Sequence, residues 1–582
     1  ALMLVVMGNL TWVLKFASAY GIGSSALYNW INVQGISADA ARESWFPSDF
    51  FGFFHGSRIY PLDNNGGYVI TEWPMFSFVL GDLHPHVMAL PFVLLAAGLA
   101  LTLYRSDEPL DVVFWLRRPL LLIASAIMVG ALGFINTWDI ATMSFVVVAA
   151  AFVSNFGRVR GITVDLVVQV VTFAVPLLLL AGLLFVPFYS GFSSQASGLL
   201  PVTTNAGIAV PGTRPLHLFL YWGPLFAAVV PFVALRLFAA RARVTPAAAA
   251  LAGAVPVAVL FVWLAVFSWN KAGDSPELAS AGSLFAQIGD RGIGWVTALI
   301  LAVLLSGGLL ALWLEVTSED DREERTGVIF TLLLAAPAFL LIFGTEFFYI
   351  GDLFGSRMNT GFKLYYQAWL LLAMAGGFAL YYLAARWRVS LKRETWVRAG
   401  WAGLVVIVLA GGALYPLGAT FNRTENFERK GELHGLHAFS TDEQAAFAWL
   451  RGLAEGQDIV IAEAVGGDYW TTGQFSRVSM ATGAPTILGW LGHENQWRGR
   501  NSPLSAGRFE DVDRLYRTAS MDEVGQIVDK YGVTYIYVGD LERSTYGEEA
   551  LRKFSSLPIA FQSGSVTVYQ ARGAAGEVST GP

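Results

Sequence analysis

The chain has 582 residues, of which 55% are hydrophobic and only 14% are charged, whereas a soluble domain carries roughly 25% charged residues. This composition excludes a disordered chain, a coiled coil and a purely soluble enzyme, and it indicates a protein that crosses a membrane several times. Cysteine is absent and the formal charge is −6, which excludes disulfides and thiolate metal sites and argues against nucleic-acid binding.

Eleven stretches are long and apolar enough to span a membrane as helices, for which about 20 apolar residues are needed. They are residues 1–18, 85–104, 119–135, 140–155, 166–188, 216–238, 246–268, 292–315, 328–345, 364–385 and 399–418. No basic segment with a cleavage site precedes the first stretch, so we predict no signal peptide and expect further sequence upstream. We therefore predict a mostly α-helical, multi-pass membrane domain over residues 1–418.

The linkers between these stretches alternate in chemistry. One set is short and rich in arginine, which places it in the cytoplasm by the positive-inside rule. The other set is longer, aromatic and poor in cations, and it comprises residues 19–84, 189–215, 269–290 and 346–362. We therefore predict a protein of the cell membrane with the second set of linkers, and the region after residue 420, on the outer face.

The region from residue 420 onward has ordinary polarity. Residues 459–462, 533–538 and 566–569 have the pattern of short strands, and residues 441–454 and 520–531 have the pattern of helices. Strands that alternate with helices predict a small extracytoplasmic α/β domain over residues 420–572. Residues 573–582 are expected to be a frayed tail.

The ten stretches after the first carry charged residues only near their ends. An ion-coupled transporter usually keeps an ionisable group near the midplane of the membrane. Polar residues gather instead in the predicted outer loops, beside helix ends. This distribution favours an enzyme that acts on a lipid-borne substrate at the outer membrane face.

The first such loop ends with Asp82, His84 and His86, immediately around Pro85. Aspartate and histidine at this spacing can coordinate a divalent metal such as Mg or Mn, or share a proton. The alternative is local: Asp82 or His84 caps the helix that Pro85 opens.

The second loop places two acids, two bases and an asparagine within 18 residues. Cations at an outer interface suit a phosphate head group, which arginine can bind through two oxygens. The alternatives are snorkelling side chains and an internal ion pair between Glu346 and Arg357. The candidate residues of this loop and of the helix that follows are Glu346, Asp352, Arg357, Asn359, Lys363, Tyr365 and Tyr366.

Weaker signals come from other loops. Asp139 follows a short turn and would lie near the same face, although a cap for the next span explains it better. The segment 489–498 is dense in aromatic and polar groups and suits either a sugar contact or local packing. The further candidates are Arg58, Glu72, Asp139, His493, Glu494, Trp497 and Arg498. No HExxH, GxSxG or P-loop motif is present.

Together, the segments GDLHPH (81–86), NTWD (136–139) and RMNTGFKLYYQ (357–367) resemble the prokaryotic "YYY" membrane proteins. This family of unknown function is grouped with the GT-C glycosyltransferase superfamily. The resemblance also covers Gly8-Asn9, Ser57-Arg58 and the Gly489–Arg498 segment. It implies a GT-C-like fold and a polyprenyl-phosphate sugar donor without a nucleotide, haem or flavin. Family members begin with further helices and an acidic first loop, so we expect this sequence to be a C-terminal part or a shortened member.

The leading hypothesis is a membrane glycosyltransferase of the cell envelope, which transfers a sugar from a polyprenyl-phosphate to an extracytoplasmic acceptor. Such chemistry needs a base for the acceptor hydroxyl and a cation for the leaving phosphate. We assign Asp82 as base or metal ligand, helped by His84 and His86, with Arg357 and Lys363 for the phosphate. Glu346 and Asp352 would orient these groups. A flippase or transporter, a non-catalytic membrane scaffold and a lipid-modifying phosphotransferase remain alternatives.

Overall fold

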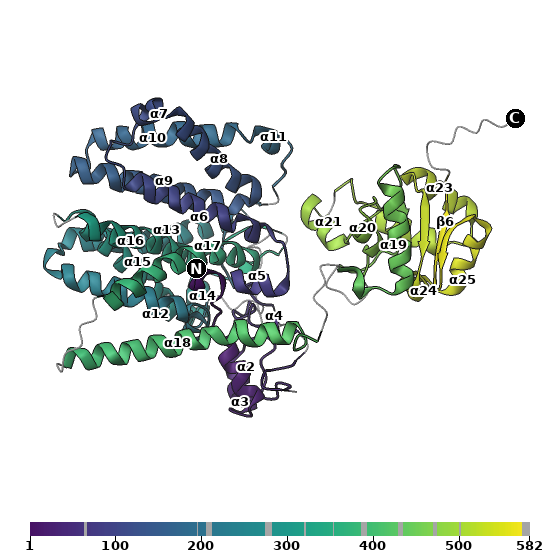
Figure 1. Ribbon diagram of the computed structural model, residues 1–582, viewed down its shortest axis with the longest axis horizontal. Helices are drawn as coiled ribbons and strands as arrows, with labels where there is room; N and C mark the ends of the chain where they lie inside the picture. The colour runs from purple at the N-terminus through teal and green to yellow at the C-terminus, as the bar shows by residue number, and fades with distance from the viewer. Residues whose placement is uncertain are drawn as a thin grey trace. The chain divides into compact units, whose positions relative to one another are not determined.

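The computed structural model describes all residues except 43, 50, 63–66, 195, 205–211, 274–281, 319–321, 353, 386–392, 429–434, 469–473, 500–501 and 573–582. The predicted frayed tail therefore lies outside the described residues. The chain divides into two compact units, residues 1–429 and 430–582, and Figure 1 shows the elements of each.

Nine helices in the described part of the first unit are long and apolar enough to cross a membrane. They are α6 (Pro85–Tyr104), α9 (Thr137–Val159), α10 (Val164–Leu183), α12 (Pro215–Ala240), α13 (Pro246–Ala272), α15 (Gly294–Val316), α16 (Arg322–Gly344), α17 (Arg357–Ala385) and α18 (Arg393–Arg423). All nine coincide with predicted spans. The predicted span 119–135 is also a helix, α8 (Pro119–Ile135), which is shorter than the other nine.

The prediction of one helix over residues 1–18 is wrong. The chain there forms α1 (Leu2–Val5) and α2 (Thr11–Ala19), separated by a break that contains Gly8 and Asn9. The Asn9 side chain donates to the Gly56 carbonyl at 2.8 Å and accepts from the Thr11 backbone N–H at 3.1 Å. An asparagine that bonds locally in this way competes with the helical ladder and starts a new helix. Apolar composition alone did not reveal this break.

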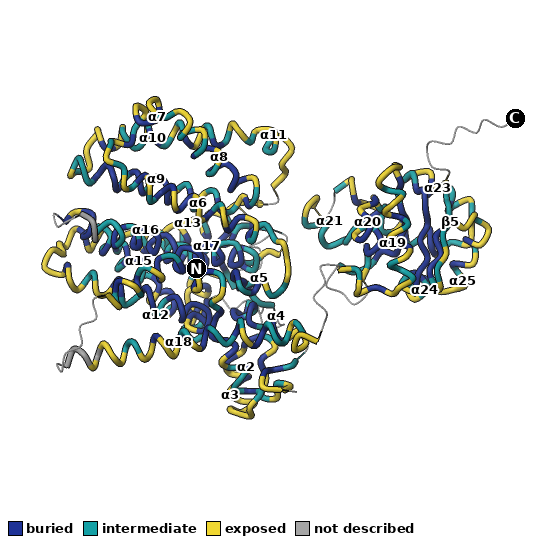
Figure 2. Tube along the Cα trace, viewed as in Figure 1, coloured by how far each residue is buried: buried dark blue, intermediate teal, exposed yellow. Residues whose placement is uncertain are grey.

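Helix α17 forms the centre of the first unit. It packs against α12, α16 and α1, and also against α9, and its residues are mostly buried, as the dark trace of Figure 2 shows. Helices α6, α8, α9 and α10 pack on one another as a second group. Because α9 touches both α16 and α17, it joins the two groups.

Short elements join the ends of the long helices. They are α3 (Ser25–Ile31), α4 (Gly52–His55), α5 (Pro74–Leu80), α7 (Val112–Arg117), α11 (Val186–Tyr189), η1 (Arg241–Arg243) and α14 (Leu284–Asp290). Strand β1 (Leu199–Pro201) pairs antiparallel with β2 (Phe348–Ile350), with Leu200 opposite Tyr349. This pairing puts the linkers 189–215 and 346–362 at the same end of the bundle, as the alternation of linker chemistry requires.

The second unit is a four-stranded sheet with helices. The strands β3 (Ile461–Ala462), β4 (Tyr535–Val538), β5 (Ile559–Ser563) and β6 (Val566–Gln570) lie in the order β3-β4-β6-β5, and only the β3–β4 pair is parallel. The helices are η3 (Gly435–Ala438), α19 (Thr441–Ala454), α20 (Arg477–Thr482), α21 (Leu491–Arg498), α22 (Arg508–Arg517), α23 (Met521–Tyr531), α24 (Asp540–Tyr546), α25 (Glu548–Leu551) and η4 (Arg552–Ser556). The five predicted elements are present, whereas β5 was not predicted.

Candidate functional site

The GDLHPH and RMNTGFKLYYQ segments meet at the beginnings of α6 and α17. The His86 ring stacks on Phe362 with 4.4 Å between ring centroids, and it meets Tyr366 edge-on at 5.2 Å. The His84 ring also contacts Phe362, at 5.2 Å. Two segments more than 270 residues apart in the sequence therefore share one site.

The start of α6 explains how the two histidines are placed. Pro85 occupies the first helical turn, where its fixed φ and missing N–H favour a helix start. His84 is the residue before it, but its side chain makes no capping hydrogen bond, so the capping alternative is wrong for His84. The side chain turns instead to His86, with 2.8 Å between the two Nδ1 atoms.

Lys363 is the cation of this site. It lies on the second turn of α17, and its ammonium nitrogen is 4.7 Å from the centroid of the Phe362 ring. The carboxylates of Glu72, Asp139 and Asp352 all interact electrostatically with it. Within the described part of the chain, however, none of them comes within 4.0 Å to form an ion pair with Lys363. Its N–H donors are therefore available to a ligand.

The surrounding acids come from three segments of the first unit. Glu72, which precedes α5, pairs with Arg58 at 3.2 Å. Asp139, in the first turn of α9, is buried and accepts from the Asn136 amide at 3.0 Å. Asp352, in the loop before α17, accepts from the amide of Asn359 at 2.9 Å. These bonds fix each carboxylate beside Lys363.

Burial weakens the acids outside the long helices. It raises the pKa of Glu72, although Arg58 partly offsets this effect. Burial also raises the pKa of Asp352, with the Asn359 amide acting in the opposite direction. Asp82 is exposed at the edge of the site, and partial desolvation raises its pKa too. A carboxylate with a raised pKa is a stronger base.

Burial also keeps His84 neutral. Desolvation, followed by the charge of Lys363, lowers the pKa of His84 to about 4. The imidazole is therefore uncharged at neutral pH and can accept or donate one hydrogen bond.

The expected metal site finds little support in the donor geometry. Among the residues that the structure describes, no three histidine, aspartate or glutamate side chains gather closely enough to hold a metal ion. His84 and His86 approach each other, but they do so as a hydrogen-bonded pair, with His86 stacked on Phe362 and His84 edge-on to it. We therefore derive no chemical step through a metal.

Arg357 belongs to a different environment from Lys363. Its Nη1 atom is 2.9 Å from Glu346 Oε1, and the two side chains are 2% and 1% exposed. Thr213 donates to the same carboxylate through its hydroxyl at 2.5 Å and its backbone N–H at 2.9 Å. The internal ion pair that the sequence left open is therefore present.

The position at which α17 begins explains this separation. We expected the span to start at residue 364, but the helix begins at Arg357. Six helical residues correspond to a rotation of about 600°, so Arg357 and Lys363 project about 120° apart. Two tyrosines further along the helix also have different surroundings. The buried Tyr365 contacts Tyr60 and Tyr221, whereas Tyr366 contacts His86. One headgroup contacting both cations would have to bridge two faces of α17.

The remaining candidates lie in the second unit, in and around α21. The Nδ1 atom of His493 is 3.7 Å from Asp468 Oδ1. Glu494 forms an ion pair with Arg498 one turn later on the helix, and the Trp497 side chain is largely exposed. Local packing accounts for Glu494 and Arg498, while Trp497 is free to meet a partner.

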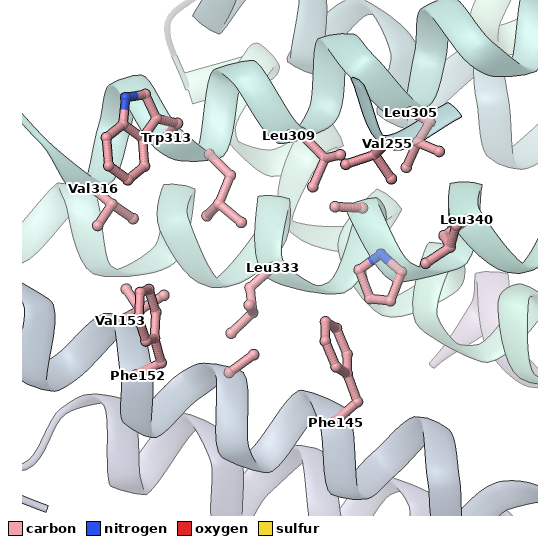
Figure 3. A pocket seen from close by; sticks show the side chains of 14 residues that line it. Phe145, Phe152, Val153, Val255, Leu305, Leu309, Trp313, Val316, Leu333 and Leu340 are labelled. Atoms are coloured by element: carbon pink, nitrogen blue, oxygen red, sulfur yellow. The ribbon is translucent and has the colours of Figure 1, made fainter. Parts of the chain in front are cut away.

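An apolar pocket that could not be predicted from the sequence lies between α9, α13, α15 and α16. Its volume is about 360 Å³. Phe145 and Phe152 project from α9 toward Leu333 and Leu340 of α16, with Trp313 of α15 at one end (Figure 3). All fourteen lining residues are apolar, and such residues look alike along any spanning helix.

The fold and the position of the charged groups define a multi-pass membrane protein with a polar site at the ends of its helices. A family model described as "Uncharacterized membrane protein (DUF2298)" matches residues 1–372. This match covers more than half of the chain, including every candidate residue of the first unit, so the protein belongs to that family of membrane proteins. A search of curated proteins finds no match.

Proposed function

We propose that this protein is a glycosyltransferase of GT-C type, which transfers a sugar from a polyprenyl-phosphate donor to an acceptor outside the cytoplasm. The observation that supports it most is the convergence of Lys363 with Glu72, Asp139 and Asp352 at the helix ends. A cation surrounded by acids provides both functions that glycosyl transfer requires, charge stabilisation of the leaving phosphate and a base for the acceptor. The likeness of its motifs to the "YYY" proteins agrees with this chemistry.

The proposed step assigns one role to each group. Asp82, at the exposed edge, takes the proton of the acceptor hydroxyl while the oxygen attacks the anomeric carbon of the sugar. The bond between that carbon and the phosphate oxygen breaks, and the phosphate keeps the electron pair. Lys363 neutralises the phosphate, because its ammonium has no ion-pair partner among the described residues. Asp139, Asp352 and Glu72 attract the lysine electrostatically without forming an ion pair with it.

The apolar pocket supplies a place for the lipid tail. Asp139 and Phe145 lie on the same helix, six residues apart, which corresponds to about 9 Å along the axis. The two residues project about 120° apart on α9, so a lipid chain whose phosphate lies near Lys363 would turn partly around the helix to reach Phe145, Phe152 and Val153. This arrangement favours a lipid-linked donor over a water-soluble one.

The proposal is tested with the purified protein, labelled polyprenyl-phosphate sugars and a mixture of acceptors, by measuring the release of polyprenyl phosphate. Asp82→Asn and Lys363→Met should reduce release at least about a hundredfold, since a general base typically contributes 10²–10⁴ in rate. Asp39→Asn is the matched control, because Asp39 is an exposed acid of the same predicted outer region. Equal release by all variants, or none by the wild type with any donor, would overturn the assignment.

The same preparation separates the alternatives. A flippase would move the labelled lipid across vesicles without cleaving it. A phosphotransferase would transfer the label of a phosphorus-labelled donor to the acceptor. A scaffold would do neither and would tolerate both substitutions.

A further inference from the structure

Two buried arginines, Arg291 and Arg357, interact with a single carboxylate, Glu346, and only Arg357 forms an ion pair with it. Arg291 follows α14 directly, and its side chain is 3% exposed. It interacts electrostatically with Glu346 and with Arg357. Glu346 is already bonded to Arg357 and to Thr213. Two guanidinium groups and one carboxylate leave this buried cluster with a net charge of about +1 at neutral pH.

The guanidinium N–H groups lack acceptors. Among the described residues, all three nitrogens of Arg291 and the Nε and Nη2 atoms of Arg357 have no hydrogen-bond partner. Buried polar groups in folded proteins are almost always hydrogen-bonded, and a buried charge without partners is costly. Five unsatisfied nitrogens on two arginines that interact electrostatically therefore point to a bound group that accepts hydrogen bonds.

The aromatic residues around Arg291 do not meet this need. Its Cζ atom lies 5.0 Å from the ring centroid of Trp263, 5.5 Å from that of Trp295 and 4.5 Å from that of Phe347. Aromatic faces attract the positive charge, but they do not replace acceptors in the plane of the guanidinium. Burial lowers the pKa of Arg291 only to about 10, so the group stays charged at neutral pH.

We propose that Arg291 and Arg357 bind one phosphate-type oxyanion, which is either inorganic phosphate or the phosphate group of a membrane lipid. An oxyanion carries several acceptor oxygens that match the forked donors of arginine, and its charge offsets the excess positive charge. The role is independent of glycosyl transfer, because Arg357 lies on a different face of α17 from Lys363 and Arg291 follows α14. The anion would tie together the segments that carry Thr213, Arg291, Glu346 and Arg357.

Binding of inorganic phosphate tests the proposal. The full chain, purified in detergent and gluconate buffer, is dialysed against labelled phosphate, and its melting temperature is followed at constant ionic strength. We expect saturable binding at one site together with a rise in Tm, since a ligand that binds only the folded state stabilises it. Arg291→Gln should weaken binding roughly ten- to hundredfold, as expected for lost charge-assisted hydrogen bonds.

Two further variants guard against a misfolded protein. Glu346→Gln removes the competing negative charge while keeping the side-chain size, so phosphate should bind about tenfold tighter. Arg214→Gln is the matched control: Arg214 already donates to the Trp30 carbonyl at 2.6 Å and stacks on the Trp30 ring, so its loss should leave phosphate binding unchanged.

Native mass spectrometry distinguishes the two sources of phosphate. A short-chain phosphatidic acid that displaces inorganic phosphate from wild type, and that Arg291→Gln fails to retain, assigns the site to a lipid headgroup. Saturation by inorganic phosphate without such displacement assigns it to the free ion. Absence of saturable binding from either source, unchanged binding in Arg291→Gln, or equal stabilisation by chloride would refute the oxyanion site.

Discussion

The buried pair of Glu346 and Arg357 makes a sharp prediction for stability. Replacing Arg357 with methionine keeps much of the side-chain volume but removes the cation 2.9 Å from Glu346 Oε1. The carboxylate keeps its two bonds from Thr213 but loses its ion-pair partner in a site with almost no solvent. Breaking one side of a buried ion pair costs about 3–5 kcal/mol, so Arg357→Met should lower the free energy of unfolding by that amount.

The assay is reversible unfolding in mixed detergent micelles, in phosphate-free buffer so that a bound anion does not contribute. The double variant Arg357→Met/Glu346→Gln removes both partners of the ion pair, although Arg291 then keeps its charge without the carboxylate of Glu346. It should still recover about 1–3 kcal/mol relative to the sum of the single effects, because the two side chains interact. Arg117→Ala serves as control, because Arg117 and Glu108 form a pair at 3.9 Å that is 70% and 41% exposed, and exposed pairs contribute about 0–1 kcal/mol.

Two results would refute this reasoning. The first is a cost below about 1 kcal/mol for Arg357→Met, which would mean that Glu346 is solvated or protonated. The second is a double variant whose cost equals the sum of the two singles, which would mean that the two side chains do not interact.

Three further predictions concern orientation, pH and packing. In intact cells an impermeant thiol reagent should label Ser555→Cys but not Asp107→Cys, and cell permeabilisation should expose the second site; the reverse pattern would invert the predicted topology. Because the pKa of His84 is lowered to about 4 in the folded state, against about 6.5 when unfolded, its contribution to stability is complete above pH 6.5. That contribution is lost as the pH falls from 6.5 toward 4. Over this range the Tm of the His84→Gln variant should therefore fall less than the Tm of the wild type. An equal fall in both proteins would contradict the burial of the ring. A Cβ on Gly294 would lie 2.8 Å from the Cα of Gly212, whereas one on Gly253 would meet nothing within 4 Å. Gly294→Ala should therefore lower the free energy of unfolding by about 1–3 kcal/mol, and Gly253→Ala should not lower it.

The Lys363 site could be predicted from the sequence only in part. Its motifs identified Asp82, His84, His86 and Lys363 as polar groups beside helix ends, because such residues are rare in a chain of this composition. The sequence did not show that His86 stacks on Phe362 or that Lys363 interacts electrostatically with Asp139. Those contacts depend on which face of α17 turns toward α6 and α9, and the hydrophobic pattern of a buried helix is nearly the same on all sides.

By itself the sequence determined the class of protein and most of its helices. A stretch of about twenty apolar residues has few alternatives to a spanning helix, since every backbone polar group must be satisfied within the segment. Three of the four short strands of the second unit were also predicted, because β-branched and aromatic residues cluster in them.

Only the tertiary structure decided the rest. Residues 1–18 form two helices and not one, because the Asn9 side chain donates a hydrogen bond to the Gly56 carbonyl. In the structure Arg357 pairs with Glu346, whereas Arg291 has no acceptor among the described residues. In the sequence all three are charged residues in or beside predicted outer loops, and nothing there distinguishes their roles. The physical reason is the same each time: a polar side chain takes its role from the groups that packing brings within hydrogen-bond distance, and these lie tens to hundreds of residues away.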